Sequence, residues 1–414
     1  MNILYLNHYA GSPIYGMEYR PYYLSREWVR AGHSVRILAG AFSHLRVRQP
    51  GVVASGARHA TAECIDGIEY VWFPTPEYQG NGLGRFLNIW AFLRQVWSEA
   101  RRIADEFRPR VVIASSTYPM DIWVARRLAR FAEAKLVFEV HDLWPLTLIE
   151  VAGMSATHPF VRLCQWAENA AYRDADVVVS MLPKVHGHMA GHGLDLRKLH
   201  IVPNGIATEE WQGSGEKPLG GTLADHIEAL RLRGVLLVGY AGSHGVPNSL
   251  DTLLDSAALL KVRQIHFLLV GDGHEKARLL ARVRNEGLSN VTMFPPIEKA
   301  CIPAFLRSLD IAYIGWQNSP IYRFGIAPNK LMDYMMAGCA VLHAVSAGND
   351  PVAESGCGLS VPPESPQAIA EGILKLSELS AAERSAMGKK GAAFVQNAHS
   401  YSVLARRFLD VLQE

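Results

Sequence analysis

The stretch Tyr322–Val341, YRFGIAPNKLMDYMMAGCAV, holds a turn, a helix and a strand in one short span. A glycine and a proline near its start predict the turn. Lys330–Ala337 has helical spacing, and Gly338 suits the C-terminal cap of that helix. The apolar run Ala340–Leu342 then predicts a buried strand. A helix followed directly by a buried strand is typical of an α/β sheet domain.

The N-terminus of this helix is a candidate ligand site. Free backbone N–H groups and the positive end of the helix dipole lie there, together with Asn329 and Lys330. A cation plus a helix dipole suits a diphosphate, and the carboxylate of Asp333, one turn further on, suits a sugar diol. We therefore hypothesise a nucleotide-sugar site. A capped surface helix is the alternative that this stretch alone leaves open.

Composition limits the class of protein. The chain has 414 residues, which predicts two or three domains. It is 49% hydrophobic and 19% charged, enough to bury a sizeable core. The formal net charge of +2 argues against a nucleic-acid partner. The small basic excess lies in the first half of the chain, which allows that half to meet an anionic surface.

Cysteine usage and the first residues predict a cytoplasmic protein. The 5 cysteines are scattered, odd in number and without a CxxC pair, which favours a reducing compartment over disulfides or a zinc site. The opening sequence MNILYLNHY has no basic region and predicts a first strand, so we expect no signal peptide. No apolar run is long enough to span a membrane.

The first residues predict a doubly wound parallel sheet. A strand at Asn2–Leu6, a loop containing Gly11 and Gly16, a helix at Tyr19–Arg30 and a strand at Ser34–Ala39 follow one another. Because ligands bind at the carboxyl ends of such strands, we expect this loop to face a cleft. The loop lacks GxGxxG, so a nicotinamide cofactor is not indicated.

A His-Asp pair follows a later strand of the same domain. Lys135–Val140 ends directly in His141 and Asp142, at the edge where residues of a binding cleft lie. Their candidate catalytic roles are general base for Asp142 and orientation or charge stabilisation for His141. The alternative is that Asp142 caps a helix with Pro145 in its first turn.

Two other N-terminal patterns each have a structural and a functional interpretation. Leu83–Phe107 predicts a long helix with tryptophans and arginines, which would either pack on the sheet or lie on a membrane surface. His186, His188 and His192 are close in sequence, but at most two of them share a helical face. We therefore expect no metal site there.

A second α/β set begins at Val235. Its first strand is followed by Gly242, Ser243, His244 and Gly245, whose backbone N–H groups are able to approach a phosphate. The interpretation of this loop as a phosphate site is strengthened because the helix that begins at Lys330 is part of the same predicted sheet domain. The polar, glycine-rich stretch before it predicts a linker. The predicted organisation is therefore a first domain at 1–206, a linker at 207–234 and a second domain at 235–396. A C-terminal helix at 397–414 would return toward the first domain.

Several segments, taken together and in order, resemble family-4 glycosyltransferases of the GT-B fold. They are AGH at Ala31–His33, HDLWP at His141–Pro145, PNGI at Pro203–Ile206, the loop Gly239–Gly245, GDGHEK at Gly271–Lys276 and PNKLMDYMMAG at Pro328–Gly338. The resemblance covers nearly the whole chain. It is closest to the WbuB-like branch of bacterial polysaccharide transferases, associated with O-antigen or capsule assembly.

The resemblance implies two Rossmann-like domains that face a central cleft. It implies a nucleotide-sugar donor on the C-terminal domain, with UDP favoured and an N-acetylated amino sugar as a candidate. A lipid-linked or saccharide acceptor would bind the N-terminal domain, with peripheral contact to the inner face of the cytoplasmic membrane. It further implies transfer with retention of configuration and without a metal or another cofactor.

The family's Glu-x7-Glu signature places its second carboxylate, which binds the ribose hydroxyls, at Asp333. The first falls on Gly325 and is missing, so Arg323 and Asn329 are the candidate substitutes for holding the sugar ring. The family's loop lysine is also absent, with His244 nearby instead. Lys330 is then the main cation for the diphosphate.

Two other functions stay open from the sequence. An enzyme of the same fold that is not a transferase, such as a nucleotide-sugar epimerase, would show turnover with the donor alone. A two-domain solute-binding protein would need export, against which the expected lack of a signal peptide argues.

Overall fold

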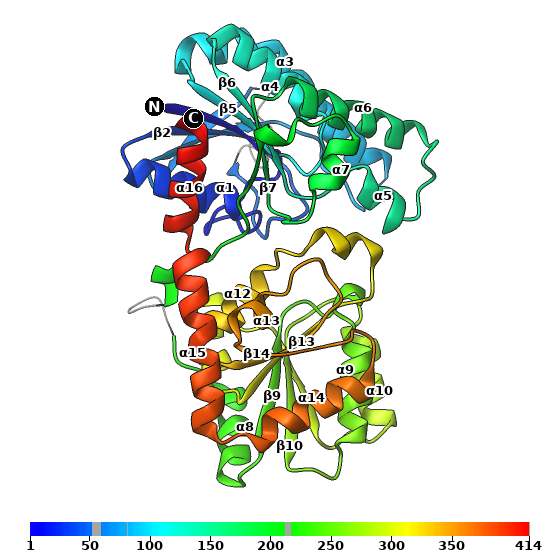
Figure 1. Cartoon of the computed structure of the whole chain (residues 1–414). Helices are drawn as coiled ribbons and strands as arrows, with labels where there is room; N and C mark the ends of the chain where they lie inside the picture. Colours follow the sequence, from blue (N-terminus) through cyan, green and yellow to red (C-terminus); the bar gives the residue numbers. More distant parts are fainter. Residues whose placement is uncertain (52–58, 81, 212–216, 414) are drawn as a thin grey trace. The chain divides into compact units, whose positions relative to one another are not determined.

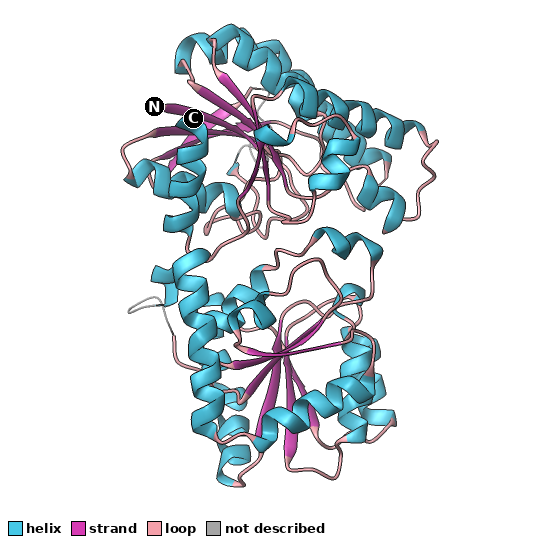
Figure 2. Ribbon diagram, viewed as in Figure 1, coloured by secondary structure: helices cyan, strands magenta, loops and turns pink. Residues whose placement is uncertain are grey.

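The computed structural model describes residues 1–51, 59–80, 82–211 and 217–413, and its fold is α/β (Figure 1). The chain forms two compact units. Unit 1 joins residues 1–204 to residues 401–414, and unit 2 comprises residues 205–400. Each unit has one central sheet with helices on both faces (Figure 2). The predicted fold class of two doubly wound parallel-sheet domains is therefore confirmed.

The sheet of unit 1 has the strand order β3-β4-β2-β1-β5-β6-β7-β8. Neighbouring strands pair in parallel, except for the antiparallel hairpin of β3 and β4. The strands are β1 (Asn2–Leu6), β2 (Ser34–Gly40), β3 (Thr61–Ile65), β4 (Ile68–Phe73), β5 (Val111–Ala114), β6 (Lys135–Val140), β7 (Val177–Ser180) and β8 (Leu199–Ile201). Apolar side chains on the central strands are buried on both faces, which is why these strands read as continuous apolar runs.

The helices of unit 1 cover both faces of this sheet. They are α1 (Arg20–Arg30), α3 (Leu83–Phe107), α4 (Asp121–Ala132), α5 (Leu146–Glu150), α6 (Pro159–Asp174), α7 (His186–Gly191), the 3-10 turn η1 (Leu196–Lys198) and α16 (Tyr401–Gln413). The end of the chain thus belongs to the same unit as its beginning.

Helix α16 packs on α1 through aromatic side chains. The rings of Tyr23 and Tyr401 stack at 4.8 Å, and the rings of Trp28 and Phe408 meet edge to face at 5.3 Å. The indole N–H of Trp28 donates to the carbonyl of Ala405 at 3.0 Å. Trp28 is completely buried, so α16 completes the core of unit 1.

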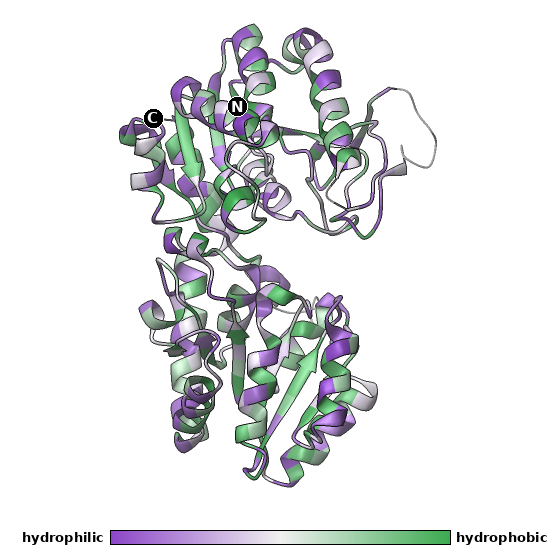
Figure 3. Ribbon diagram, turned by 90° about the vertical axis from the view of Figure 1, so that its right-hand side faces the viewer, coloured by the Kyte–Doolittle hydropathy of each residue, from purple (hydrophilic) through white to green (hydrophobic). Residues whose placement is uncertain are grey.

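The sheet of unit 2 is parallel throughout, in the order β11-β10-β9-β12-β13-β14. Coloured by hydropathy, its strands are largely apolar, as expected for strands covered on both faces (Figure 3). They are β9 (Leu236–Ala241), β10 (Ile265–Val270), β11 (Val291–Phe294), β12 (Ile311–Gly315), β13 (Ala340–Ala344) and β14 (Gly358–Val361).

The helices of unit 2 alternate with these strands. The α-helices are α8 (Gly221–Leu232), α9 (Leu250–Leu259), α10 (Lys276–Asn285), α11 (Ile302–Arg307), α12 (Asn329–Met336), α13 (Pro351–Ser355), α14 (Pro366–Glu378) and α15 (Ala381–Ala398), and the 3-10 turns are η2 (Thr208–Trp211), η4 (Val246–Asn248), η5 (Lys299–Cys301) and η6 (Pro320–Phe324). Helix α12 and strand β13 occupy the stretch that predicted them, and Gly338 has the positive φ of 74° that a C-terminal glycine cap adopts.

The predicted linker 207–234 is wrong for most of its length. Residues 212–216 lie outside the described residues, but η2 and α8 are part of unit 2. Leu223, Ile227 and Leu230 of α8 lie in the core of this unit, as does Trp211 of η2. The three aliphatic residues recur at three- and four-residue spacing, so the helix has an apolar face to bury.

Among the described residues, no helix has the length and apolar content needed to cross a membrane.

Candidate functional site

In unit 2, Lys330 is a largely buried cation that pairs with neutral groups. Its Nζ donates to the hydroxyl of Tyr240 at 2.8 Å and to Oδ1 of Asn248 at 2.5 Å. The ammonium also lies 4.8 Å from the centre of the Tyr240 ring. No described carboxylate forms an ion pair with it. Burial lowers the pKa of Lys330 to about 8 because the charged form is poorly solvated.

The glycine loop after β9 lies against this lysine. A Cβ atom at Gly242, whose φ is +151°, would be 2.7 Å from Cδ and 3.0 Å from Nζ of Lys330. Any other residue would therefore push the cation aside. Gly271, in the loop after β10, is equally constrained. A Cβ added at this position would lie 1.9 Å from the carbonyl oxygen of Gly242. The two glycine loops thus pack backbone to backbone beside Lys330.

His244 is held between these loops. Its backbone N–H donates to the carbonyl of Asp272 at 2.7 Å, and its carbonyl accepts from the N–H of Glu275 at 3.1 Å. The imidazole is fully buried, and neither ring nitrogen has a hydrogen-bond partner among the described residues. Burial, reinforced by the charge of Lys276, lowers the pKa of His244 to about 4. The ring is therefore a neutral group with unused hydrogen-bonding capacity.

The other residues of this loop are also placed by the structure. Ser243 is exposed and Gly245 is buried. The carbonyl of Ser243 accepts from the Tyr240 hydroxyl at 2.7 Å and from Nδ2 of Asn248 at 2.9 Å. Both partners also contact Lys330. The loop and the lysine are thus joined by one small hydrogen-bond network.

Asn329 and Asp333 lie on the same helix as Lys330. Asn329 is the exposed first residue of α12, next to the free N–H groups of its first turn. Asp333 is half-buried, and no described residue donates a hydrogen bond to its carboxylate. Burial raises the pKa of Asp333 to about 7, with a lowering effect from Lys299 and a raising effect from Glu210. The carboxylate is thus available to a ligand hydroxyl.

The turn before α12 is built differently from the family pattern. Gly325 stands where the signature has its first glutamate, and its φ is +102°. Arg323 donates to the carbonyl of Pro320 at 2.6 Å and lies over the ring of Phe324 at 4.3 Å. Asn349 holds the turn from the other side through both backbone groups of Ile326. The Arg323 guanidinium is thus engaged within its own turn.

In unit 1, the loop after β1 folds back on itself. The N–H of Gly11 donates to the carbonyl of Glu18 at 2.8 Å, and Ser12 and Gly16 exchange backbone hydrogen bonds at 3.0 and 2.7 Å. A Cβ at Gly11 would lie 1.8 Å from the Gly16 carbonyl oxygen, and Gly16 has a φ of +102°. Both glycines are therefore required for the close approach of the two arms of this loop.

His141 stands on a buried network of charged and polar groups. Its Nε2 lies 2.8 Å from the hydroxyl of Ser115 and 3.5 Å from Oε2 of Glu139. Glu139 is completely buried and forms an ion pair with Arg20 at 2.9 Å. Burial of the imidazole opposes its protonation, but the hydrogen bond and charge of Glu139 outweigh burial and raise the pKa of His141.

The ion pair below His141 is fully satisfied. Arg20 also donates to the carbonyls of Val202 and Pro203, at 2.9 and 2.6 Å. The hydroxyls of Ser115 and Tyr5 donate to Glu139. Despite its burial, the charge of Arg20 and the hydrogen bond from His141 hold the pKa of Glu139 well below its usual range.

Asp142 does not cap a helix. Pro145 occupies the N-cap position of α5, and no side chain caps that helix. Asp142 is exposed and lines a small pocket with His141, Glu139 and Glu168. The capping alternative is therefore excluded, and the pair lies at the carboxyl end of β6.

Helix α3 packs on the sheet with one face and exposes the other. Ile89, Phe92 and Val96 are buried, as the packing interpretation predicts. On the opposite side Leu83, Leu87, Trp90 and Trp97 are 73%, 51%, 51% and 43% exposed. Arginine side chains flank the exposed tryptophans, with Arg94 5.4 Å from the Trp90 ring and Arg127 4.6 Å from the Trp97 ring.

Sequence reasoning missed the residues that support each site. Arg20, Ser115 and Glu139 converge on His141 from three separate segments. Tyr240 contacts Lys330 from 90 positions earlier in the chain. One signal was available for Glu139, because a charged residue inside an otherwise apolar central strand must have a buried partner.

The fold of both units is that of GT-B glycosyltransferases. Sucrose-phosphate synthase from Thermosynechococcus elongatus is similar over 100% of this chain and 98% of its own, with a TM-score of 0.73 and 17% identity. Anabaena HepE, solved in complex with UDP and glucose, is similar over 100% of both chains, with a TM-score of 0.67 and 16% identity.

Family models match each unit separately. Residues 15–205 match the glycosyl transferase 4-like domain, and residues 235–378 match the glycosyl transferases group 1 domain. A curated relative, the putative colanic acid biosynthesis glycosyl transferase WcaI of Escherichia coli K12, is 24% identical over 358 residues, covering 84% of this chain and 85% of its own. The chain therefore carries a glycosyl transferase 4-like domain followed by a glycosyl transferases group 1 domain.

Proposed function

We propose that the chain is a retaining glycosyltransferase that uses a UDP-sugar donor and a lipid-linked or saccharide acceptor in cell-surface polysaccharide assembly. The observation that carries the donor site is Lys330. This largely buried ammonium has no carboxylate partner in the part of the chain that the structure describes, and it lies beside a glycine loop and a helix N-terminus. It therefore needs an anion to compensate it.

The donor diphosphate would lie against Lys330, the N–H groups of the Gly242–Gly245 loop and the first turn of α12. As the glycosidic bond breaks, negative charge grows on the leaving UDP. A fixed cation and fixed N–H dipoles stabilise this charge without reorganisation. Lys330 would therefore replace a divalent metal at the diphosphate, and no metal is needed there. Asp333 would hold the ribose hydroxyls, and Asn329 or His244 would contact the diphosphate or the sugar.

The acceptor would bind unit 1 beside His141 and Asp142. The raised pKa of His141 favours an imidazolium that stabilises negative charge or orients a hydroxyl. Asp142 is exposed to the pocket and is a candidate general base. The donor phosphate is the alternative proton acceptor.

The comparisons support the donor and the pathway. HepE, of similar fold, was solved with UDP and with UDP-glucose. The name of WcaI places that relative in colanic acid biosynthesis. These relatives favour UDP as the nucleotide. The N-acetylated amino sugar and the WbuB-like O-antigen or capsule branch rest on the sequence resemblance alone.

The exposed face of α3 favours a location of this protein on the cytoplasmic surface of the membrane. Tryptophans flanked by arginines suit the interface between anionic head groups and acyl chains. Wild type is expected to pellet in part with vesicles that contain anionic lipid and to be released by salt. A Leu87→Ser, Trp90→Ser variant is expected to stay in the supernatant, and equal pelleting of both proteins would contradict this part of the proposal.

A thermal-shift panel tests the donor site directly. UDP, GDP, ADP and CMP are compared on wild type and on Asp333→Ala. A ligand at ~100 times its dissociation constant stabilises by about 2.7 kcal/mol. We expect UDP to raise the melting temperature of wild type, and Asp333→Ala to lose most of that shift. A larger shift with GDP would reject UDP, and no shift with any nucleotide would reject the donor site.

Turnover separates transfer from epimerisation. Incubation with the UDP-sugar alone is expected to leave the sugar unchanged apart from slow hydrolysis, whereas acceptor addition releases UDP. The anomeric configuration of the product reports on retention. Added Mg²⁺ or Mn²⁺ is expected not to raise the rate, and a strict requirement for either ion would contradict the role given to Lys330.

A further inference from the structure

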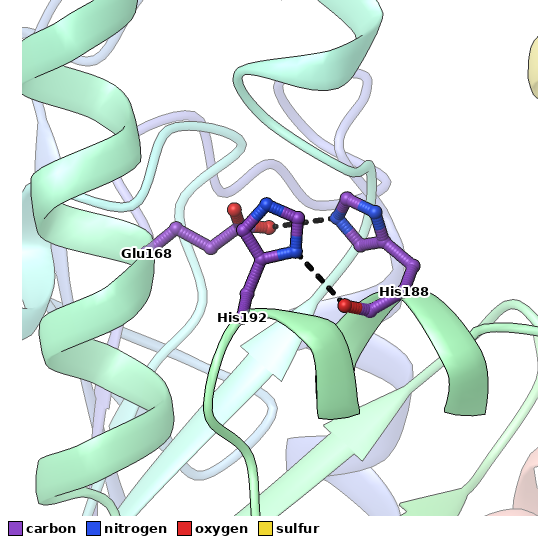
Figure 4. Close-up of side chains that lie close together, drawn as sticks. All are labelled: Glu168, His188 and His192. Carbon is purple, nitrogen blue, oxygen red and sulfur yellow. Dashed lines mark hydrogen bonds and ion pairs between the residues drawn. The ribbon is translucent and has the colours of Figure 1, made fainter.

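Helices α6 and α7 of unit 1 bring together three side chains that take no part in the proposed transfer (Figure 4). Glu168 comes from α6, His188 from α7, and His192 directly follows α7. One ligand-type atom of each residue lies within 4.8 Å of those of the other two. The two imidazole rings are one helical turn apart, with their centres 4.3 Å from each other.

The hydrogen bond of His192 fixes which ring nitrogen is available. Its Nδ1 lies 2.9 Å from the backbone carbonyl of His188. A carbonyl only accepts, so Nδ1 carries a proton, and in the neutral imidazole the lone pair is then on Nε2. Metal-binding histidines are commonly oriented in this way by a backbone carbonyl.

The charge of Glu168 also points to a cation. The residue is only 2% exposed, and its oxygens accept from the Tyr172 hydroxyl at 2.8 Å and from Nε2 of Gln165 at 2.7 Å. Both donors are neutral. In the described part of the chain, no lysine or arginine forms an ion pair with Glu168, while Nε2 of His188 lies 3.5 Å from it. A positive partner stabilises a buried carboxylate, and a metal ion bound between Glu168 and His188 would supply one.

We propose that Glu168, His188 and His192 bind one Zn²⁺ ion. Two neutral imidazoles and a carboxylate form a His₂Glu set, which suits zinc with a water as fourth ligand. Calcium and magnesium prefer all-oxygen sites. Zinc bonds of about 2 Å require the three side chains to close in by rotation. Gln165 and Tyr172 would hold the carboxylate in place as supporting partners.

The ion would act on unit 1 and not on the donor diphosphate. It would tie α7 to α6, and Glu168 also lines the pocket of His141 and Asp142. We therefore expect it to fix one wall of that pocket. Zinc binding is independent of the nucleotide, so a UDP thermal shift would persist even if no zinc were bound.

Zinc titration of the chelator-treated full-length protein tests this proposal. Wild type is expected to bind one equivalent, measured by competition with a chromogenic chelator, and to gain thermal stability on binding. His192→Gln and Glu168→Gln are expected to bind at least about tenfold more weakly. His186→Gln is the matched control, because His186 is an exposed residue of the same helix outside the cluster. It is expected to bind like wild type.

Tyr172→Phe covers the case in which the ligand variants fail to fold. It removes only the hydroxyl that supports Glu168, and it is expected to weaken zinc binding by about tenfold. Absence of a saturable site in wild type would overturn the proposal. Equal affinity of the His192→Gln and His186→Gln variants would overturn it as well.

Discussion

The candidate sites of the two units differ in how their buried charges are compensated. Beside His141, Glu139 and Arg20 neutralise each other, and every neighbouring donor has a protein acceptor. Beside Lys330, the neutral oxygens of Tyr240 and Asn248 are the only side-chain acceptors that the described residues offer the buried ammonium. The first arrangement is complete without a ligand, whereas the second needs an anion. This contrast is the physical reason to place the diphosphate in unit 2.

The largest expected effect is that of Lys330→Ala on transfer. Loss of one fixed group that stabilises developing charge costs about 3–4 kcal/mol, or roughly a hundredfold to a thousandfold in rate. The measurement is kcat/KM with UDP-sugar. Lys375→Ala on α14 is the control, because this exposed lysine is expected to leave kcat/KM unchanged. A loss below about threefold would remove Lys330 from the mechanism.

Glu139→Gln tests the compensated site of unit 1. It leaves Arg20 as an unpaired buried charge, so the free energy of unfolding is expected to fall by about 3–5 kcal/mol. Urea unfolding followed by tryptophan fluorescence measures this change. Glu69→Gln is the control, because it breaks the half-exposed ion pair with Arg36 in the same unit and should cost less than about 1 kcal/mol. Equal losses in both variants would refute the contrast.

Asp333→Ala tests the candidate site of unit 2, the one that needs a bound anion. Hydrogen bonds from ribose hydroxyls to a carboxylate are worth about 1.5–3 kcal/mol, so UDP affinity is expected to fall roughly tenfold to a hundredfold. Isothermal titration calorimetry with UDP measures it. Inorganic pyrophosphate, which has no ribose, should bind both proteins alike. A similar loss for pyrophosphate would place Asp333 at the phosphates.

The smallest effect is the pH dependence of UDP binding. Burial lowers the pKa of Lys330 to about 8 in the empty site, and a bound diphosphate would raise it. Binding therefore takes up a proton above pH 8, and affinity is expected to fall by about tenfold per pH unit there. Calorimetry between about pH 7 and pH 9.5 measures this slope. Lys330→Ala should show a flat profile, and a flat profile in wild type would contradict the lowered pKa.

The sequence was sufficient for elements whose signal is local. The strand–loop–helix order located the carboxyl edges of both sheets, and with them His141 and Lys330. It was not sufficient for contacts made across the sheet. Nothing in the local pattern pairs Arg20 with Glu139, because the two residues are 119 positions apart and only the strand order brings them together.

Two interpretations of the sequence were limited for the same reason. The linker prediction relied on polar, glycine-rich composition, which could not show that Leu223, Ile227 and Leu230 pack into the core of unit 2. The metal prediction compared His186, His188 and His192 with one another only. It could not show that α6 brings Glu168 to two of them. In both cases the deciding partner lies on another element.

The return of α16 to unit 1 has a consequence for biosynthesis. A ribosome releases residues in order, so unit 2, which is continuous in sequence, is complete before unit 1 receives the helix that covers Trp28. Residues that follow unit 2 in the sequence thus finish the first domain. A prematurely terminated chain would therefore leave Trp28 and Tyr23 uncovered, which gives chaperones and proteases an apolar mark by which to tell an unfinished molecule from a finished one.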